Sequence, residues 1–215
     1  MITFNKISQT AESVFKLQPP DNDMPIFGMK RRIALGVMCL TILIGSLDMT
    51  ILNIALPDLV VNLKATNIQL EWIVDSYAVV TAGLLIFAGS LGDRIGRKIL
   101  LVVGLTVFAA GSIVSAFSSS VLMLIVGRAI MGVGSAFTMP ATLSLITSMF
   151  RRQNERALAI GIWSGTEGIG IALGPIAGGW LLAHFWWGSV FLINVPIAVI
   201  AANLIKLNAF LNDSE

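Results

Sequence analysis

The chain has 215 residues, of which 56% are hydrophobic and 12% charged, and its formal net charge is +2. Soluble domains carry about 25% charged residues, so this composition excludes an ordinary water-soluble globule. It also excludes a disordered chain, which needs low hydrophobicity and high net charge. The single cysteine excludes an intramolecular disulfide, and we expect no metal site and no cofactor. The composition is typical of a membrane protein.

Six continuous apolar segments are each long enough to cross about 30 Å of hydrocarbon as an α-helix. A β-barrel would instead show short segments of alternating hydrophobicity. The predicted spans are residues 33–56, ending at Pro57, and then residues 72–91, 99–117, 121–142, 157–182 and 187–205. We therefore predict an all-α membrane protein with a bundle of six transmembrane helices.

The flanking segments are polar and short. Residues 1–32 are predicted to be a cytoplasmic tail, residues 33–206 the six-span transmembrane domain, and residues 207–215 a short cytoplasmic C-terminal tail.

The basic residues predict the orientation of this bundle. One side of the membrane receives twelve of the fourteen: Lys6, Lys16, Lys30, Arg31, Arg32, Arg94, Arg97, Lys98, Arg151, Arg152, Arg156 and Lys206. The opposite side receives only Lys64, and Arg128 falls inside a span. Because cytoplasmic loops are rich in Lys and Arg, we expect a multi-pass protein of the cell (inner or plasma) membrane with both termini in the cytoplasm.

Four ionisable residues fall inside the predicted spans: Asp48, Asp75, Arg128 and Glu167. A charge at the centre of a span costs at least about 2.5–3.5 kcal/mol, and such residues usually face the bundle and carry function. At a rise of about 1.5 Å per residue, Asp48 and Arg128 both lie about 8–10 Å below the outer boundary of the hydrocarbon. They are therefore within reach of each other, either as a proton-responsive pair or as a static ion pair that joins two spans.

The other two acids lie at different depths. Asp75 lies about one helical turn below the outer boundary, and Glu167 lies close to the midplane. Both are candidate carboxylates for a cationic ligand. The alternatives are a wetted position at the mouth of the bundle for Asp75 and a hydrogen bond to a neighbouring helix for Glu167.

Two stretches are rich in glycine. The fifth span carries Pro175 and several glycines, among them Gly161, Gly165, Gly170, Gly174, Gly178 and Gly179. Glycines four residues apart permit close helix packing and a proline can kink the helix, so this span is either a hinge or gate or an ordinary packing surface. Residues 89–98, between the second and third spans, are predicted to form a tight turn with one acid and three bases.

The residues of this turn carry a family resemblance. Gly89, Leu91, Asp93, Arg94, Gly96, Arg97 and Lys98 resemble the loop signature G-x-L-x-D-R-x-G-R-[KR] of the major facilitator superfamily. Further segments resemble motifs of its fourteen-span drug:proton antiporter branch, in the expected order. They are Leu47 to Pro57, Trp72 to Asp75, Arg128 to Gly134 (R-x-x-x-G-x-G), Gly170 to Gly179 (G-x-x-x-G-P-x-x-G-G) and Trp187 to Pro196.

The resemblance implies roles for these residues. Asp48 and Arg128 would couple protons, and Asp75 and Glu167 would bind substrate. A cytoplasmic gate would be formed by Gly89, Asp93, Arg94, Gly96, Arg97 and Lys98. The helix interface that prevents leak would be formed by Gly170, Gly174, Pro175, Gly178 and Gly179.

The resemblance also implies what the chain does. Family members have twelve or fourteen spans in two halves, and this chain resembles the first half. We expect a proton-coupled antiporter that exports hydrophobic or cationic drugs by alternating access. Its partners would be a small-molecule substrate, protons, the bilayer and a missing C-terminal half or a second copy, without nucleic acid. The alternative is a non-transporting remnant or an assembly subunit of a transporter. We do not expect an enzyme, because Gly-x-Ser-x-Gly and His-Glu-x-x-His are absent from the sequence.

Overall fold

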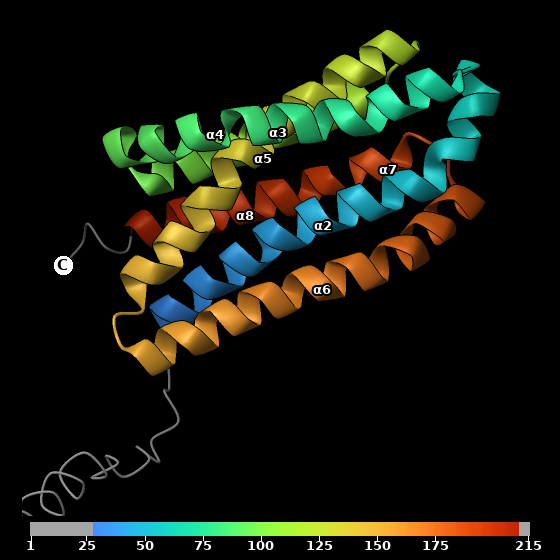
Figure 1. Cartoon of the computed structure of the whole chain (residues 1–215). Helices are drawn as coiled ribbons and strands as arrows, with labels where there is room; N and C mark the ends of the chain where they lie inside the picture. The colour runs from blue at the N-terminus through green and yellow to red at the C-terminus, as the bar shows by residue number, and fades with distance from the viewer. Residues whose placement is uncertain (1–27, 211–215) are drawn as a thin grey trace, which may run out of the picture.

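The computed structural model describes residues 28–210, with side chains described as far as residue 207, so the predicted tails fall largely outside the described residues. Within this range every regular element is a helix (Figure 1). The helices are α2 (Met29–Leu63), α3 (Asn67–Ile95), α4 (Arg97–Ala116), α5 (Val121–Met149), α6 (Gln153–His184), α7 (Ser189–Leu192) and α8 (Asn194–Phe210).

Six helical segments are long and apolar enough to cross a membrane, the last of them being Ser189–Leu207, which joins α7 and α8. The predicted all-α fold with six spans is therefore confirmed. The helices extend beyond the predicted spans at most ends. The expected end of the first helix at Pro57 is wrong, because α2 continues through Pro57 and ends before Lys64, which has a left-handed conformation at φ 53°. A proline removes one backbone donor but does not by itself end a helix of this length.

The turns at both ends of the bundle are short. The backbone nitrogen of Thr66 donates to the side chain of Gln69 at 2.9 Å and fixes the start of α3. The hydroxyl of Ser120 accepts from the backbone nitrogen of Met123 at 3.2 Å and caps α5. Consecutive spans run in opposite directions, and the starts of α2, α4 and α6 lie at the same end as the last residues of α3, α5 and α8 (Figure 1).

This end carries most of the described basic residues, and we call it the basic end. Its members are Lys30, Arg31, Arg32, Arg94, Arg97, Lys98, Arg151, Arg152, Arg156 and Lys206. The ion pair between Arg31 and Glu155, at 3.2 Å, links the first turns of α2 and α6 there.

Glycines bring α4 and α5 into close contact. A Cβ atom on Gly134 would lie 2.6 Å from the backbone nitrogen of Phe108, and one on Gly111 would lie 2.7 Å from that of Met131. Neither position tolerates a larger side chain without movement of the facing backbone, so these small residues set the distance between the two helices.

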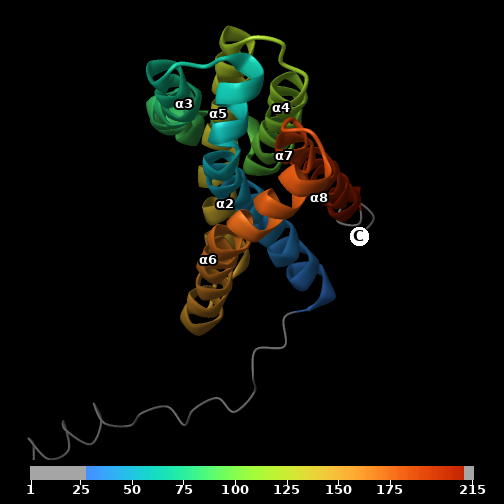
Figure 2. The same cartoon turned by 90° about the vertical axis from the view of Figure 1, so that its right-hand side faces the viewer.

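The helices surround a buried centre. Figure 2 shows α2 near the middle of the bundle, with α3, α4 and α5 above it and α6 below it. The last helix, α8, packs against both α2 and α4. The outer faces of α3 and α6 expose large apolar side chains such as Ile86, Ile169 and Ile176, which are 87%, 56% and 69% exposed. Such faces indicate contact with lipid or with another polypeptide.

Candidate functional site

Asp48 of α2 and Arg128 of α5 form a buried ion pair between Oδ2 and Nη1. The two residues are 2% and 1% exposed. The helical rise predicted this proximity, and the structure brings the two side chains into contact. A charge this deeply buried is destabilising unless it is paired and hydrogen-bonded, so the surroundings of the pair determine whether it can persist.

Two further helices complete these surroundings. Asn194, at the start of α8, donates through Nδ2 to Oδ1 of Asp48 at 2.9 Å. On the opposite side, Nε of Arg128 donates to the carbonyl oxygen of Ile73 in α3 at 3.2 Å. The guanidinium carbon of Arg128 also lies 4.5 Å from the centre of the Tyr77 ring, in the range of a cation–π contact. The pair therefore ties together α2, α3, α5 and α8.

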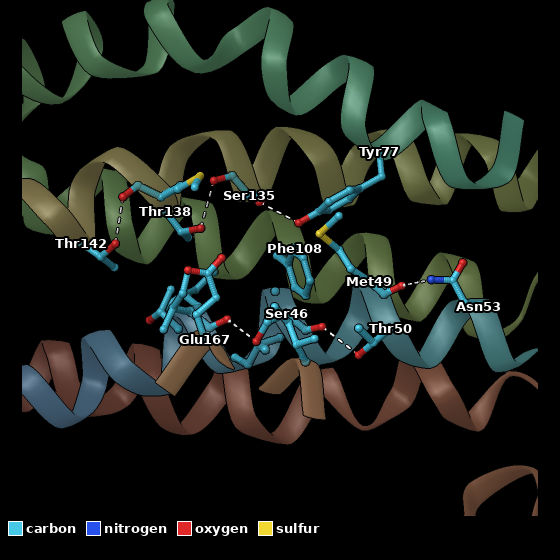
Figure 3. Close-up of a pocket in the computed structure, with 17 residues that line it drawn as sticks. Ser46, Met49, Thr50, Asn53, Tyr77, Phe108, Ser135, Thr138, Thr142 and Glu167 are labelled. Carbon is cyan, nitrogen blue, oxygen red and sulfur yellow. Dashed lines mark hydrogen bonds between the residues drawn. The ribbon is translucent and has the colours of Figure 1, made fainter. Parts of the chain in front are cut away.

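A cavity of about 300 Å³ lies next to this network. Residues from α2, α3, α4, α5 and α6 line it. Figure 3 shows that both polar and apolar side chains face this cavity. The volume is at the lower end of the range for small-molecule sites. Glu167 of α6 is the one carboxylate among the described residues that line it.

Tyr77 connects the ion pair to the cavity. Its ring contacts the guanidinium of Arg128, and its hydroxyl donates to Oγ of Ser135, a cavity residue of α5, at 2.8 Å. Tyr77 itself also lines the cavity (Figure 3). The Tyr77 side chain therefore contacts both Arg128 and the cavity wall.

Asp75 does not join this site. It is exposed on α3 and is not one of the cavity residues. Its predicted role in substrate binding stays a prediction that the cavity geometry does not support. Glu167, which is half-buried, does line the cavity, as a substrate-binding role requires.

The predicted gate residues lie at the basic end. The prediction of a turn over residues 89–98 is wrong in extent, because α3 continues to Ile95 and only Gly96 separates it from α4. Gly96 has φ +95°, a conformation that glycine adopts without strain. Gly89, Arg94 and Lys98 lie within the adjoining helices.

One ion pair and one hydrogen bond order this gate segment. Arg97 pairs with Asp93 at 3.3 Å and also donates to the carbonyl oxygen of Ser144 in α5 at 3.3 Å. The segment is therefore attached to α5 through Arg97.

The glycines of α6 divide into two faces. Gly170, Gly174 and Gly178 are buried against Ser46, Thr50 and Ile51 of α2. Pro175 and Gly179 lie on the exposed face, and a Cβ atom on Gly179 would meet nothing within 4 Å. Of the five predicted interface residues, the three buried glycines pack α6 against α2 within this bundle. Pro175 and Gly179 instead face away from α2.

Several site residues were not singled out from the sequence as functional. Asn194 and Tyr77 complete the ion-pair network, and hydroxyl residues of α2 and α5 line the cavity. One signal was available, because Ser135 and Thr142 follow Arg128 at intervals of seven residues and so lie on the same face of α5.

Comparison with known proteins identifies the family. The Major Facilitator Superfamily profile matches residues 38–212. The methyl viologen resistance protein SmvA of Salmonella typhimurium is 42% identical over 172 residues, which are 80% of this chain and 35% of that protein. The multidrug efflux pump LfrA of Mycolicibacterium smegmatis is 47% identical over 165 residues, 77% of this chain and 33% of the pump. The riboflavin transporter RibZ of Clostridioides difficile is 37% identical over 177 residues, 82% of this chain and 39% of the transporter.

The chain thus spans about a third of the length of the curated relatives it matches. These relatives are transport and resistance proteins rather than enzymes. The sequence resemblance, the six helices and the profile match agree: the chain belongs to the Major Facilitator Superfamily.

Proposed function

We propose that the chain is the N-terminal half of a proton-coupled antiporter that exports hydrophobic or cationic drugs by alternating access. The observation that carries this proposal is the buried Asp48–Arg128 pair beside a cavity that contains Glu167. The match to about a third of each drug-resistance relative supports assignment to one half of a longer transporter.

In this proposal Asp48 is the proton acceptor. A proton on its carboxylate would cancel the charge that holds Arg128, and the guanidinium would then need a new partner. Because Arg128 lies on the ring of Tyr77, its movement would reposition the Tyr77 hydroxyl in the cavity wall. Proton binding and substrate binding would be coupled in this way through direct contacts rather than over a distance.

The cavity supplies the substrate site of the proposal. Glu167 would attract the positive charge of a drug, and side chains such as Phe108 and Met49 would contact its apolar part. Asp75 stays a second candidate, at the mouth rather than in the cavity. The complete substrate path would form only with a C-terminal half or with a second copy of the chain.

The remaining residues would control access. The basic end would face the cytoplasm of the cell membrane, and both termini would lie there. The segment around Asp93 and Arg97 would gate that side, and the α6 residues from Gly170 to Gly179 would prevent leak.

The test is proton-driven efflux of ethidium from membrane vesicles, with the chain alone and in its full-length context. We expect Asp48→Asn to abolish efflux, because the substituted side chain cannot bind and release a proton. Asp58→Asn, on the same helix but outside the ion-pair network, is the matched control and should retain efflux. Unchanged efflux in Asp48→Asn would refute proton coupling at this residue. Failure of efflux in every context would favour the alternative of a non-transporting protein.

A further inference from the structure

We infer that Asn194 of α8 is a positioning residue that hydrogen-bonds to both forms of Asp48, donating to the carboxylate and accepting from the carboxylic acid. Proton binding would then loosen the contact of α2 with α5 and leave its contact with α8 in place. The inference rests on the proposed function, because it takes Asp48 as the proton acceptor. It adds which of the two partners of Asp48 responds to the proton.

The carboxylate of Asp48 has a different partner on each oxygen. Nη1 of Arg128 pairs with Oδ2, and Nδ2 of Asn194 donates to Oδ1 at 2.9 Å. Asn194 is 0% exposed, so this contact is formed away from water. An ionised carboxylate only accepts hydrogen bonds, and the amide therefore has to present its nitrogen to Asp48 in this state.

The same amide has a buried acceptor that is not used. Within the described part of the chain, three buried side-chain nitrogen or oxygen atoms have no hydrogen-bond partner: Oδ1 of Asn194, Nε1 of Trp163 and Oγ of Ser189. Buried polar atoms are normally paired, so an unpaired one needs an explanation. For Oδ1 of Asn194 the explanation is a second state of the site, in which Asp48 carries a proton.

Rotation of the amide by half a turn connects the two states. The rotation exchanges nitrogen and oxygen, which have nearly the same size, so the packing is unchanged. Oδ1 of Asn194 then occupies the present position of Nδ2, which lies 2.9 Å from Oδ1 of Asp48. There it accepts the hydrogen bond that a carboxylic acid O–H donates. One bond to Asp48 exists before and after the rotation, so the contact between α2 and α8 persists.

Arg128 has no second state of this kind. Its guanidinium only donates and keeps its charge at every accessible pH. A proton on Asp48 therefore removes the charge attraction on the α5 side, while Nε of Arg128 still donates to the carbonyl oxygen of Ile73 at 3.2 Å. The effect of the proton thus falls on the contact between α2 and α5.

The other titratable groups around the pair do not replace Asn194. The ring of Tyr77 lies against Arg128, and Glu167 lines the adjacent cavity. Among the described residues, Arg128 and Asn194 are the side chains that form an ion pair or a hydrogen bond with Asp48.

The test is infrared difference spectroscopy of residues 1–215 in nanodiscs, between high and low pH, with the side-chain carbonyl of asparagine labelled with ¹³C. The carboxyl band that is lost in Asp48→Asn reports the proton on Asp48. We expect an asparagine carbonyl band to move to lower wavenumber with the same pH midpoint, because its oxygen gains a hydrogen bond. This movement should be lost in Asn194→Leu, which keeps the size of the side chain and removes its donor and its acceptor.

Asn203→Leu is the matched control. Asn203 is an exposed residue of the same helix, and its replacement should leave the asparagine band in place. Asn194→Gln assigns the band if Asn194→Leu does not fold. Glutamine keeps an amide but does not carry the label, so the isotope shift of the band should disappear.

Spin-label distances test the second part of the inference. In a Cys39→Ser background, labels at Val61 of α2 and Leu122 of α5 report one contact, and labels at Val61 and Ile200 of α8 report the other; these three positions are 76%, 72% and 53% exposed. At low pH we expect the first distance to change and the second to stay. In Asn194→Leu both should change.

The outcomes separate this inference from the proposed function. If the Asp48 carboxyl band titrates without an asparagine band, or if the band persists in Asn194→Leu, the role of Asn194 is refuted and the proton acceptor stands. A change of the α2–α8 distance in wild type, or no change of the α2–α5 distance once Asp48 is protonated, would also overturn the inference. If no Asp48 carboxyl band appears at any pH at which the protein stays folded, both proposals fail.

Discussion

Replacement of Asp48 by asparagine should be among the most destabilising single changes in the bundle. The side chain keeps its size and one oxygen, but Arg128 is left 1% exposed without a counter-charge. Removing one partner of a buried ion pair typically costs about 3–5 kcal/mol. We expect a loss near the lower limit, because Arg128 keeps its hydrogen bond to the carbonyl of Ile73 at 3.2 Å and its contact with the Tyr77 ring.

A double variant separates the charge effect from a packing effect. Asp48→Asn/Arg128→Met contains neither charge, and the asparagine can still accept from Asn194. We expect it to recover at least about 2 kcal/mol relative to Asp48→Asn, since a buried pair replaced as a unit is often close to neutral.

The free energy of unfolding is measured by titration with SDS in mixed micelles. The single cysteine of the chain, Cys39, lies partly buried on α2, and its modification by a thiol reagent reports unfolding. A loss below about 1 kcal/mol in Asp48→Asn, or a double variant less stable than the single one, would refute the view that the two charges stabilise each other.

Two glycine substitutions and one control substitution test the packing and the turn by the same titration. Gly134→Ala should destabilise the bundle by about 1–3 kcal/mol, because its Cβ atom would lie 2.6 Å from a backbone atom of α4. Gly165→Ala is the control and should be neutral or stabilising, because a Cβ atom there meets nothing within 4 Å. A similar loss of stability in both variants would contradict the packing argument. Gly96→Ala should cost about 1–2 kcal/mol, because φ +95° is strained for alanine, and an unchanged midpoint would argue that the turn adopts another conformation.

The number of helices and the ion pair were predictable because both follow from regular helix geometry. Long apolar segments identify spans, and the rise per residue places Asp48 and Arg128 at the same depth. The depth of Glu167 likewise indicated a position inside the bundle, and it lines the cavity. The roles of these residues in proton coupling and substrate binding stay predictions.

Depth alone does not determine which face of a helix a residue occupies. For this reason the sequence did not show that Asp75 is exposed and lies outside the cavity. At about 100° per residue, Asp75 points about 200° away from Tyr77, so only one of the two can face the bundle. The buried residue is Tyr77, because its ring lies against Arg128. The same arithmetic separates Gly174 and Gly178, which face α2, from Pro175 and Gly179, which do not.

Asn194 was not predicted as a member of the site for a different reason. An amide in an apolar span costs far less than a charge, so it does not stand out. Its position also depends on the break between α7 and α8 next to Ile193, which the continuous apolar segment did not reveal.

The order of these partners along the chain has a consequence for biosynthesis. Asp48 leaves the ribosome 80 residues before Arg128 and 146 residues before Asn194. At about 5–20 residues per second, the first span waits about 4–16 s for its counter-charge. During that interval its carboxylate has to stay in a hydrated part of the translocon or hold a proton. If the carboxylate stays ionised, the step that releases α2 into lipid is expected to follow the synthesis of α5, and α2 and α5 are expected to insert together.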